Sequence, residues 1–373
     1  MLCAALAVSA FAGCSKTETP APDSANEMAT PIEQPSEEVT EPVVEEAEQT
    51  AKEIKILKNE DAPEGFVYNE LSGRLIDASL ENQRPIAAMV DNELTALDHY
   101  GINDADVIYE MMNSTENNRV TRLMVIQKDW GSIERMGSIR STRTTNCILA
   151  AEWNAVLCHD GGPAVFIDEY IKTESIDNIS GVFARIDNGK AREFTEYITQ
   201  TDLQKYLKNS TTISSEYTKY YTGPHFQFTE ECALDGNDYL YTKDATKKIV
   251  LPFPHNSSEL HYNADTNLYE YYEYGNAHKD GATGEVLSVR NVILQKASFG
   301  EWGLGYMWYN ITGDGEGYYI TDGKCVPITW HKDSSLEANT HFLDANGNDI
   351  ILNAGTTYIG IVPDDTWDSL VIQ

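Results

Sequence analysis

Basic residues are scarce in this sequence. Its 373 residues include 27 Lys and Arg against 59 Asp and Glu, which gives a formal net charge of −32. A chain of this charge is repelled by phosphate backbones and by anionic lipid headgroups. The composition therefore argues against general nucleic-acid binding and against a polybasic membrane-binding surface.

Long apolar runs and common catalytic motifs are also missing. No apolar stretch reaches the ~20 residues that a transmembrane helix needs. The sequence has no G-x-S-x-G elbow, S-x-x-K, H-E-x-x-H or P-loop. Nucleophilic catalysis therefore has no support, and a non-enzymatic role is favoured over an enzymatic one.

Cysteine is sparse, and its pairing is open. Downstream of the N-terminal segment the chain has Cys147, Cys158, Cys232 and Cys325, each beside apolar residues and none in a C-x-x-C pair. This pattern does not predict a zinc site. Four cysteines allow three disulfide pairings, and free buried thiols are an equally good interpretation.

The N-terminal segment carries an export signal. Residues 1–14 are small and apolar and end in Gly-Cys, which resembles the end of a bacterial lipoprotein signal with lipid on Cys14. An ordinary apolar helix is the alternative, but the run is short and acidic residues follow it. No Lys or Arg precedes the run, which predicts a start codon upstream of Met1.

Residues 15–65 are predicted to be a disordered acidic linker. They contain fourteen acids, four lysines and six prolines. Such a segment has too little apolar content to offset the entropy of ordering, and like charges keep it extended. It would space a folded body from the membrane that holds the lipid anchor.

The rest of the chain divides into two predicted domains. Residues 68–212 alternate strand and helix signals, which indicates an α+β or α/β sheet domain. Residues 225–373 have short Tyr-, Thr- and Val-rich strands cut by turns, which indicates a β-rich domain. Strands are expected over 85–90, 107–112, 120–127, 155–158, 247–251, 268–274, 289–297, 317–321, 326–331 and 357–362. Helices are expected over 141–153, from 163 and over 192–208.

An arginine cluster is the most informative chemical feature. Five of the ten arginines fall between residues 119 and 143, where the local charge is +4. Arg140 and Arg143 flank Ser141 at a predicted helix start, where free backbone N–H groups favour anions. With Arg122 they predict a phosphate or carboxylate site. The alternative is that these arginines pair with acids of the chain, such as Asp91, Asp106 or Glu110.

Three further groups of residues are weaker candidates. His159, Gly161 and Gly162 follow a predicted buried strand, where α/β sheets place ligands, although a plain turn explains them too. Asp91 and Glu110 could hold Mg²⁺ beside an anion, or lie on a solvated face. Aromatic residues over 269–274 and 302–309 could stack on sugars, or pack within the sheet.

Several motifs together resemble the YerB-like lipoprotein family. They are RPIAAMVDN (84–92), ADVIYE (105–110), VTRLMVIQ (120–127), MGSIRSTR (136–143), VRNVILQ (289–295) and TTYIGIVP (356–363). The resemblance implies an envelope lipoprotein with an N- and a C-terminal domain of unknown function. Ser138 stands where the family's arginine motif has Pro, and Asp160 departs from the small residue common before the glycines.

The motif order is also similar to that of LytR-CpsA-Psr proteins, which bind polyprenyl pyrophosphate, an analogy of order alone. The leading hypothesis is a lipid-anchored extracytoplasmic protein that binds an anionic cell-wall or lipid-linked ligand, with no required cofactor and no nucleic-acid partner. One alternative is a Mg²⁺-assisted enzyme acting on a lipid-linked pyrophosphate or wall polymer. The other is a glycan- or protein-binding scaffold that works through the aromatic residues.

Overall fold

A computed structural model describes residues 54–235 and 246–373. The predicted signal, the predicted lipidation site Cys14 and the predicted linker up to residue 53 lie outside the described residues. Residues 54–65 are described, and the backbone N–H of Leu57 donates to the Phe228 carbonyl at 2.8 Å. The linker prediction therefore extends too far, because this last part packs against the folded body.

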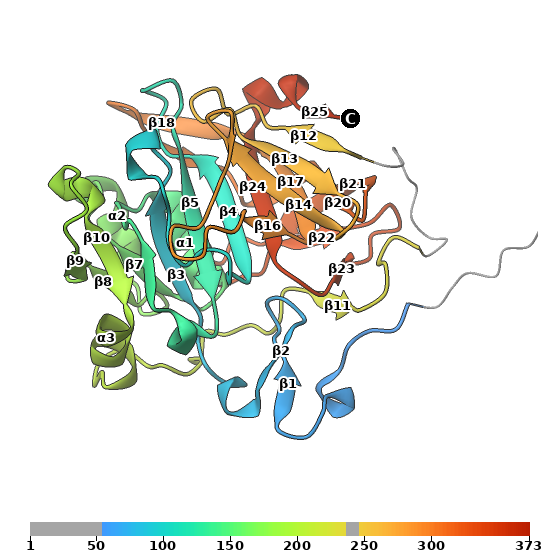
Figure 1. Cartoon of the computed structure of the whole chain (residues 1–373), viewed down its shortest axis with the longest axis horizontal. Coiled ribbons are helices and arrows are strands. Elements are labelled where there is room, and N and C mark those ends of the chain that lie inside the picture. Colours follow the sequence, from blue (N-terminus) through green and yellow to red (C-terminus); the bar gives the residue numbers. More distant parts are fainter. Residues whose placement is uncertain (1–53, 236–245) are drawn as a thin grey trace, which may run out of the picture. The chain divides into compact units, whose positions relative to one another are not determined.

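A ten-stranded mixed sheet forms the centre of the structure (Figure 1). In spatial order its strands are β22 (His341–Leu343), β21 (Lys324–Lys332), β20 (Gly313–Thr321), β17 (Asn291–Ala297), β24 (Thr357–Pro363), β4 (Val107–Met112), β5 (Thr121–Gln127), β3 (Ile86–Asp91), β7 (Val156–His159) and β8 (Asn178–Ser180).

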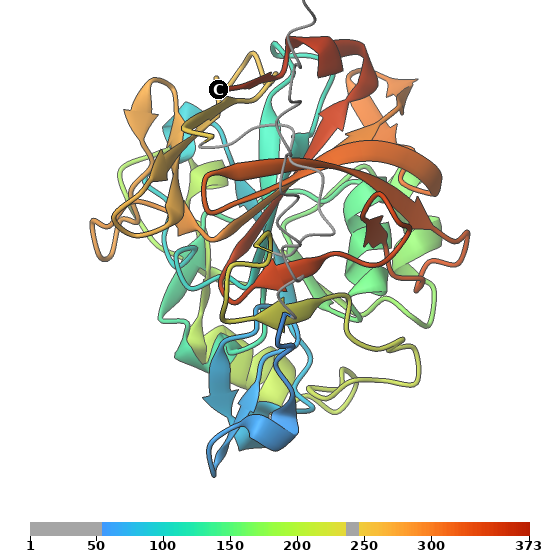
Figure 2. The same ribbon diagram turned by 90° about the vertical axis from the view of Figure 1, so that its right-hand side faces the viewer.

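The sheet joins the two halves of the chain. Strand β24 pairs in parallel with β4, with Thr357 opposite Val107 and Ile361 opposite Met111. The segments predicted as separate domains thus share one sheet and one set of backbone hydrogen bonds. Figure 2 shows the red and orange strands of the C-terminal half from the side, in front of the blue-green strands of the N-terminal half.

The other sheets are smaller. A six-stranded sheet contains β15 (Asn276–Ala277), β14 (Leu268–Glu273), β13 (Glu259–Asn263), β12 (Lys248–Val250), β25 (Val371–Ile372) and β16 (Ser288–Val289). The remaining strands are β6 (Arg135–Gly137), β10 (Glu196–Thr199) and β9 (Ala184–Arg185), then the pairs β1 (Phe66–Tyr68) with β2 (Leu75–Asp77), β11 (Gln227–Thr229) with β23 (Ile351–Asn353), and β18 (Phe299–Gly303) with β19 (Tyr306–Tyr309).

Helices are few and short. They are α1 (Thr144–Glu152), α2 (Ala164–Ile171) and α3 (Gln200–Leu203), which continues as a π-helical turn over Gln204–Lys208. Short 3-10 turns lie at Asn59–Asp61, Ala78–Leu80, Leu94–Ala96, Trp130–Ser132, Arg192–Phe194 and Asp364–Ser369. In the part of the chain that the structure describes, no helix combines the length and apolar character needed to cross a membrane. The fold is β-rich, so the helical content expected of an α/β domain was too high.

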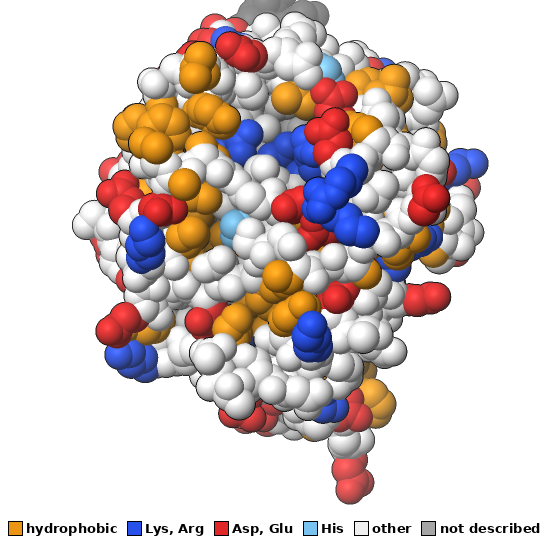
Figure 3. All heavy atoms as spheres, turned by 90° about the vertical axis from the view of Figure 1, so that its left-hand side faces the viewer, with side chains coloured by type: hydrophobic (Ala, Val, Ile, Leu, Met, Phe, Trp, Pro, Cys, Tyr) orange, Lys and Arg blue, Asp and Glu red, His pale blue; other side chains and the backbone are white. Residues whose placement is uncertain are grey.

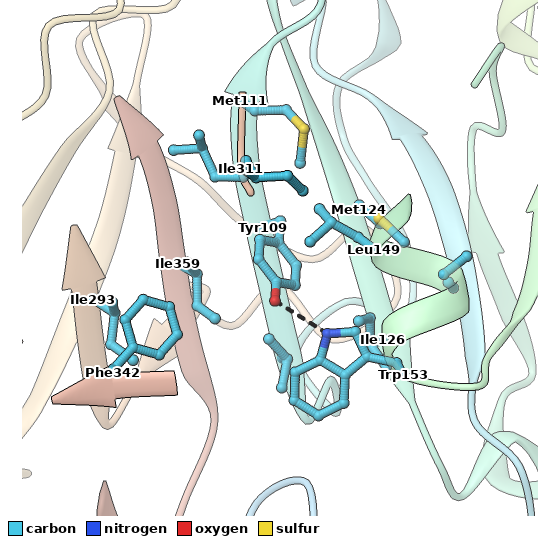
Figure 4. Close-up of a cluster of buried hydrophobic side chains, with 14 of the residues drawn as sticks. Tyr109, Met111, Met124, Ile126, Leu149, Trp153, Ile293, Ile311, Phe342 and Ile359 are labelled. Atoms are coloured by element: carbon cyan, nitrogen blue, oxygen red, sulfur yellow. Dashed lines mark hydrogen bonds between the residues drawn. The ribbon is translucent and has the colours of Figure 1, made fainter. Parts of the chain in front are cut away.

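The central strands are buried on both faces, as expected for strands covered by two layers. One face carries Met89 and Tyr109 and packs on α1; the other carries Val90 and Ile108 and packs on the six-stranded sheet. Figure 4 shows the first of these cores, in which Trp153 Nε1 donates to the Tyr109 hydroxyl at 3.0 Å. This two-faced burial decides which polar side chains at the strand ends can meet.

The predicted helix over 192–208 is partly wrong. Its first half contains strand β10, which pairs with both β6 and β9. The same spacing of apolar residues also fits a short strand followed by a helical turn. Backbone pairing of β10 with β6 and β9 selects the strand. The strands expected at 85–90, 107–112, 120–127 and 155–158 correspond to β3, β4, β5 and β7.

Candidate anion-binding site

The first two residues of the candidate site lie opposite each other at the end of the central sheet. Asp91 of β3 pairs with Arg122 of β5 in the antiparallel register, so both side chains point to the face that carries α1. Arg122 is 6% exposed. Its Nη2 lies 3.9 Å from Asp91 Oδ1, and its Nη1 donates to Asn113 Oδ1 at 2.9 Å and to the Ser141 carbonyl at 2.5 Å.

Arg140 reaches the same acid from the segment after β6. Its backbone N–H donates to the Met89 carbonyl at 2.9 Å, which holds the segment beside β3. The Nε of Arg140 lies 3.0 Å from Asp91 Oδ2, and Nη1 lies 2.8 Å from Glu193 Oε2. The guanidinium stacks on Phe194, with its carbon 5.4 Å from the ring centroid.

Arg143 stands at the N-terminus of α1, where its backbone N–H is capped by the Asn146 side chain at 3.0 Å. Its guanidinium donates to the carbonyls of Asn113 and Thr142 at 3.3 and 2.9 Å, and it lies over the Tyr306 ring at 5.2 Å. Among the described residues no carboxylate lies within ion-pair distance of it. Its positive charge therefore has no matching acid nearby.

The three arginines repel one another. Burial lowers the pKa of Arg122 to about 9, while Asp91 opposes this shift and the charges of Arg143 and Arg140 add to it. Burial also lowers the pKa of Arg143 to about 10, with Arg140 adding to the effect. Arg122 and Arg143 remain charged at neutral pH. The Nε of Arg122 is buried without a hydrogen-bond partner in the described part of the chain, whereas the Nε of Arg140 faces Asp91.

The loop after β7, which holds His159, Gly161 and Gly162, is hydrogen-bonded to the arginine segment at Ser141 and Thr142. The N–H of Thr142 donates to the Gly161 carbonyl at 3.1 Å, and Ser141 Oγ donates to the Asp160 carbonyl at 2.9 Å. His159 Nδ1 is hydrogen-bonded to the Gly161 carbonyl at 2.7 Å. Burial lowers the pKa of His159, so its ring is neutral at pH 7. Ser141 and His159 thus shape the loop, and their polar groups are already occupied.

Gly162 allows this clamp of the loop to the arginine segment to form. Its φ is +155°, and a Cβ there would lie 2.6 Å from Ile167 Cδ1 and 3.1 Å from the Thr142 carbonyl. We expect Gly162→Ala to lower the free energy of unfolding by about 1–3 kcal/mol through backbone strain and this clash. Urea unfolding would measure the loss. Gly189→Ala is the matched control, because Gly189 also has positive φ but open space around it. Equal losses in the two variants would contradict a clamp at Gly162.

The strand register separates Asp91 and Glu110, the two residues predicted to hold a metal ion. Glu110 of β4 lies opposite Leu123, one residue out of step with Arg122, so it points to the face opposite that of Asp91. Its carboxylate is buried and accepts hydrogen bonds from Thr121, Ser258, Tyr271 and Tyr358 at 2.6–2.9 Å. Asp91 and Glu110 therefore do not form one metal site.

Other candidates have structural roles. Arg119 forms a two-pronged pair with Asp365 at 2.6 and 2.8 Å, and Arg135 stacks on Tyr100 at 3.4 Å, so neither joins the site. Many of the aromatic residues proposed for sugar binding are core residues, among them Tyr269, Tyr271 and Tyr309. Cys147, Cys158 and Cys232 are free thiols, so no disulfide joins them to one another or to Cys325.

Sequence reasoning missed the other groups that surround the arginines. Asn113 follows β4, Glu193 and Phe194 come from a 3-10 turn, and Tyr306 begins β19. Only tertiary contacts bring them to the cluster. A hydrophobic patch adjoins it, in which Phe166 stacks on Trp302 at 5.0 Å and lies 5.9 Å from Tyr306. Figure 3 shows the side of the molecule that carries α2 and β18, with Lys and Arg side chains in a hollow near hydrophobic ones.

Comparisons with known proteins agree on one family. Residues 71–214 match the N-terminal domain, and residues 249–359 the C-terminal domain, of the protein family of unknown function DUF3048. The chain is 22% identical over 305 residues to "Putative lipoprotein YerB" of Bacillus subtilis (strain 168), covering 79% of this chain and 86% of that protein. The crystal structure of the YerB protein from Bacillus subtilis superposes with a TM-score of 0.68 at 19% identity, covering 82% of this chain and 99% of that one. The matched domains span most of the sequence, so this chain belongs to the DUF3048 family.

Proposed function

We propose that this protein binds an anionic ligand of the cell envelope through Arg122, Arg140 and Arg143, while lipid on Cys14 anchors it outside the cytoplasmic membrane. The observation that carries the proposal is that Arg122 and Arg140 share one buried acid, Asp91, while the charges of Arg140 and Arg143 act on Arg122 and no carboxylate among the described residues pairs with Arg143. The similarity to a lipoprotein and the signal-like residues 1–14 support the anchor.

An anion would relieve the repulsion within the cluster. Guanidinium groups bind phosphate and carboxylate with two parallel hydrogen bonds, and charge-assisted bonds of this kind are the strong ones. The start of α1 adds the positive end of its helix dipole beside Arg143. Asp91 holds Arg122 and Arg140 in place and leaves the total charge of the cluster positive.

The adjoining hydrophobic patch favours a ligand with an apolar part. Val165 and Leu304 are 88% and 83% exposed, and Trp302 is half exposed next to Phe166. Tyr306 contacts both Phe166 and the Arg143 guanidinium, so it connects the patch with the cluster. A lipid-linked phosphate or pyrophosphate would place its charge on the arginines and its chain on the patch.

Thermal unfolding of the purified protein tests this proposal. Phosphate, pyrophosphate and a prenyl pyrophosphate are compared, each with and without Mg²⁺. A ligand at about 100 times its Kd should stabilise the protein by ~2.7 kcal/mol, which corresponds to a rise in Tm of a few degrees. The order expected is prenyl pyrophosphate above pyrophosphate above phosphate.

Variants connect the shift to the site. Arg143→Gln should abolish most of the shift and keep the fold, because Arg143 has no acidic partner among the described residues. Arg119→Gln is the matched control, since Arg119 is a partly exposed arginine outside the cluster. No shift with any of the three anions, or an equal shift in folded Arg143→Gln, would overturn the proposal. A shift only with Mg²⁺ present would favour the metal-assisted enzyme instead.

A further inference from the structure

Two histidines and one glutamate meet in the interior, away from the arginine cluster. His99 follows the 3-10 turn Leu94–Ala96, Glu273 ends β14, and His278 comes directly after β15. All three side chains are buried. The two imidazole rings lie 4.8 Å apart between centroids, and one ligand atom from each of the three residues lies within 4.8 Å of the others.

Each histidine has one nitrogen bound to the protein and one without a partner. His99 Nε2 contacts the Asp91 carbonyl, so this nitrogen carries the proton and donates it. His278 Nδ1 is hydrogen-bonded to Glu273 Oε1 at 2.6 Å. The remaining nitrogens, His99 Nδ1 and His278 Nε2, are buried and have no hydrogen-bond partner in the described residues.

The unpaired buried lone pair of His99 Nδ1, in a cluster with Glu273 and His278, needs a physical reason. A buried acceptor without a partner costs about 1–3 kcal/mol, and such groups are rare in native proteins. A histidine that donates one N–H to a carbonyl or carboxylate and keeps the other nitrogen free is the arrangement that proteins use to orient a metal ligand. His99 has this arrangement, and His278 Nδ1 and Glu273 Oε1 already face each other beside it.

We propose that His99, Glu273 and His278 bind a divalent transition-metal ion, with zinc as the best fit. Two imidazoles and a carboxylate are a donor set that zinc uses, whereas Mg²⁺ and Ca²⁺ prefer oxygen ligands throughout. With zinc–ligand distances of 2.0–2.2 Å, neighbouring ligand atoms of a tetrahedron lie roughly 3.3–3.5 Å apart. Side-chain shifts of roughly 1 Å would bring the three groups to this spacing, and a fourth position would remain for another ligand.

The charges around the cluster suit a cation. The negative charges of Asp98 and Asp280 act on His278. Asp280 is held in place, since its Oδ2 accepts from the Gly101 N–H at 2.7 Å and its Oδ1 from the Ala282 N–H at 2.8 Å.

The proposed ion would join the two family domains. His99 belongs to the segment matched as N-terminal, and Glu273 and His278 belong to the segment matched as C-terminal. His99 Nε2 is also hydrogen-bonded to the backbone carbonyl of Asp91, whose side chain pairs with Arg122 and Arg140. The proposed ion would therefore lie near the arginine cluster. The metal proposal does not depend on anion binding, because it uses a different set of side chains.

Metal titration of the full chain tests the proposal. The protein is stripped with a chelator, dialysed, and titrated with Zn²⁺ by calorimetry. We expect one equivalent to bind and Tm to rise by several degrees. Replacing Zn²⁺ by Co²⁺ should give the visible absorption of a tetrahedral nitrogen- and oxygen-ligated ion. No stoichiometric binding, or a Co²⁺ spectrum typical of an octahedral aqua-like ion, would overturn the proposal.

Variants identify the ligands. His278→Gln should lose the bound equivalent and the Co²⁺ spectrum. His261→Gln is the matched control, because His261 lies on neighbouring β13 and pairs with a partly exposed Glu259. Retention of the equivalent in folded His278→Gln would contradict the assignment. If His278→Gln does not fold, Glu273→Gln and the Co²⁺ spectrum of the unaltered protein decide the question. Anion binding is measured on the same samples, so that failure of the metal proposal can be told apart from failure of the anion-binding proposal.

Discussion

Replacing Lys332 by Met is expected to lower the free energy of unfolding by about 3–5 kcal/mol. Lys332 Nζ lies 3.1 Å from Glu152 Oε2, and both side chains are fully buried between α1 and β21. Removing the lysine leaves a buried carboxylate without its counter-charge, which costs far more than loss of a surface pair. Chemical denaturation at pH 7 measures the change.

The hydrogen bonds around Glu152 explain why the acid stays ionised. Burial acts to raise its pKa, but His225, Lys332 and the Thr340 N–H overcome this and lower the pKa to about 2. His225 Nε2 donates at 3.1 Å and Thr340 N–H at 2.9 Å. The pKa is depressed on folding, so the stability it contributes is present above pH 4.5 and is lost as pH falls toward 2.

Two controls make the Lys332 prediction specific. Lys172→Met removes an exposed lysine that pairs with Asp168 and should cost less than about 1 kcal/mol. The double variant Lys332→Met with Glu152→Gln should recover a large part of the loss, because it removes both buried charges. A loss below 1 kcal/mol in Lys332→Met, or no recovery in the double variant, would show that the pair is not the source of the effect.

Glu110→Gln should change how stability depends on pH. Glu110 is enclosed between the two main sheets, and burial raises its pKa to about 7 against the hydrogen bonds of Tyr358, Ser258 and Thr121. A carboxyl group whose pKa is raised on folding stabilises the protein most below its unfolded pKa of 4.5. That contribution is lost as pH rises through 7.

The difference between the two proteins should therefore grow with pH. Between pH 4.5 and pH 7 the unaltered protein should lose on the order of 3 kcal/mol relative to Glu110→Gln, at 1.36 kcal/mol per unit of pKa shift. The buried His99 and His278 have lowered pKa values and act with the opposite sign, but they are present in both proteins. Urea unfolding at pH 5 and pH 8 in metal-free buffer gives the comparison.

A surface glutamate provides the reference for this experiment. Glu316 is more than half exposed and pairs with Lys296, so Glu316→Gln should leave the pH profile unchanged. An identical stability difference between the unaltered protein and Glu110→Gln at both pH values would mean that Glu110 has an ordinary pKa in the folded state.

The local strand pattern was readable from the sequence. The run VIYEMM predicts a strand over residues 107–112, and β4 spans the same residues. Buried strands of this kind are dense in apolar and β-branched residues, so their position does not depend on distant contacts. The β-rich character of residues 225–373 was readable for the same reason, from short strands between turn residues.

The close sequence spacing of Arg122, Arg140 and Arg143 predicts a shared anion site, which stays a prediction. Spacing alone could not say which acid they meet, because a shift of one residue along a strand turns a side chain to the opposite face. The pairing of β3, β5 and β4 places Asp91 beside Arg122 and turns Glu110 away. The prediction that Asp91 and Glu110 hold one metal ion is therefore wrong.

The contacts between the two halves of the chain were decided by tertiary structure alone. The sequence by itself determined the strands, the acidic composition and the local excess of arginine, because these depend on neighbouring residues. Tertiary structure decided that β24 joins β4, that Tyr306 covers Arg143, and that His99 meets His278. The physical reason is that burial of both faces of one sheet selects the register and the partners, and no local pattern encodes a partner from the other half of the chain.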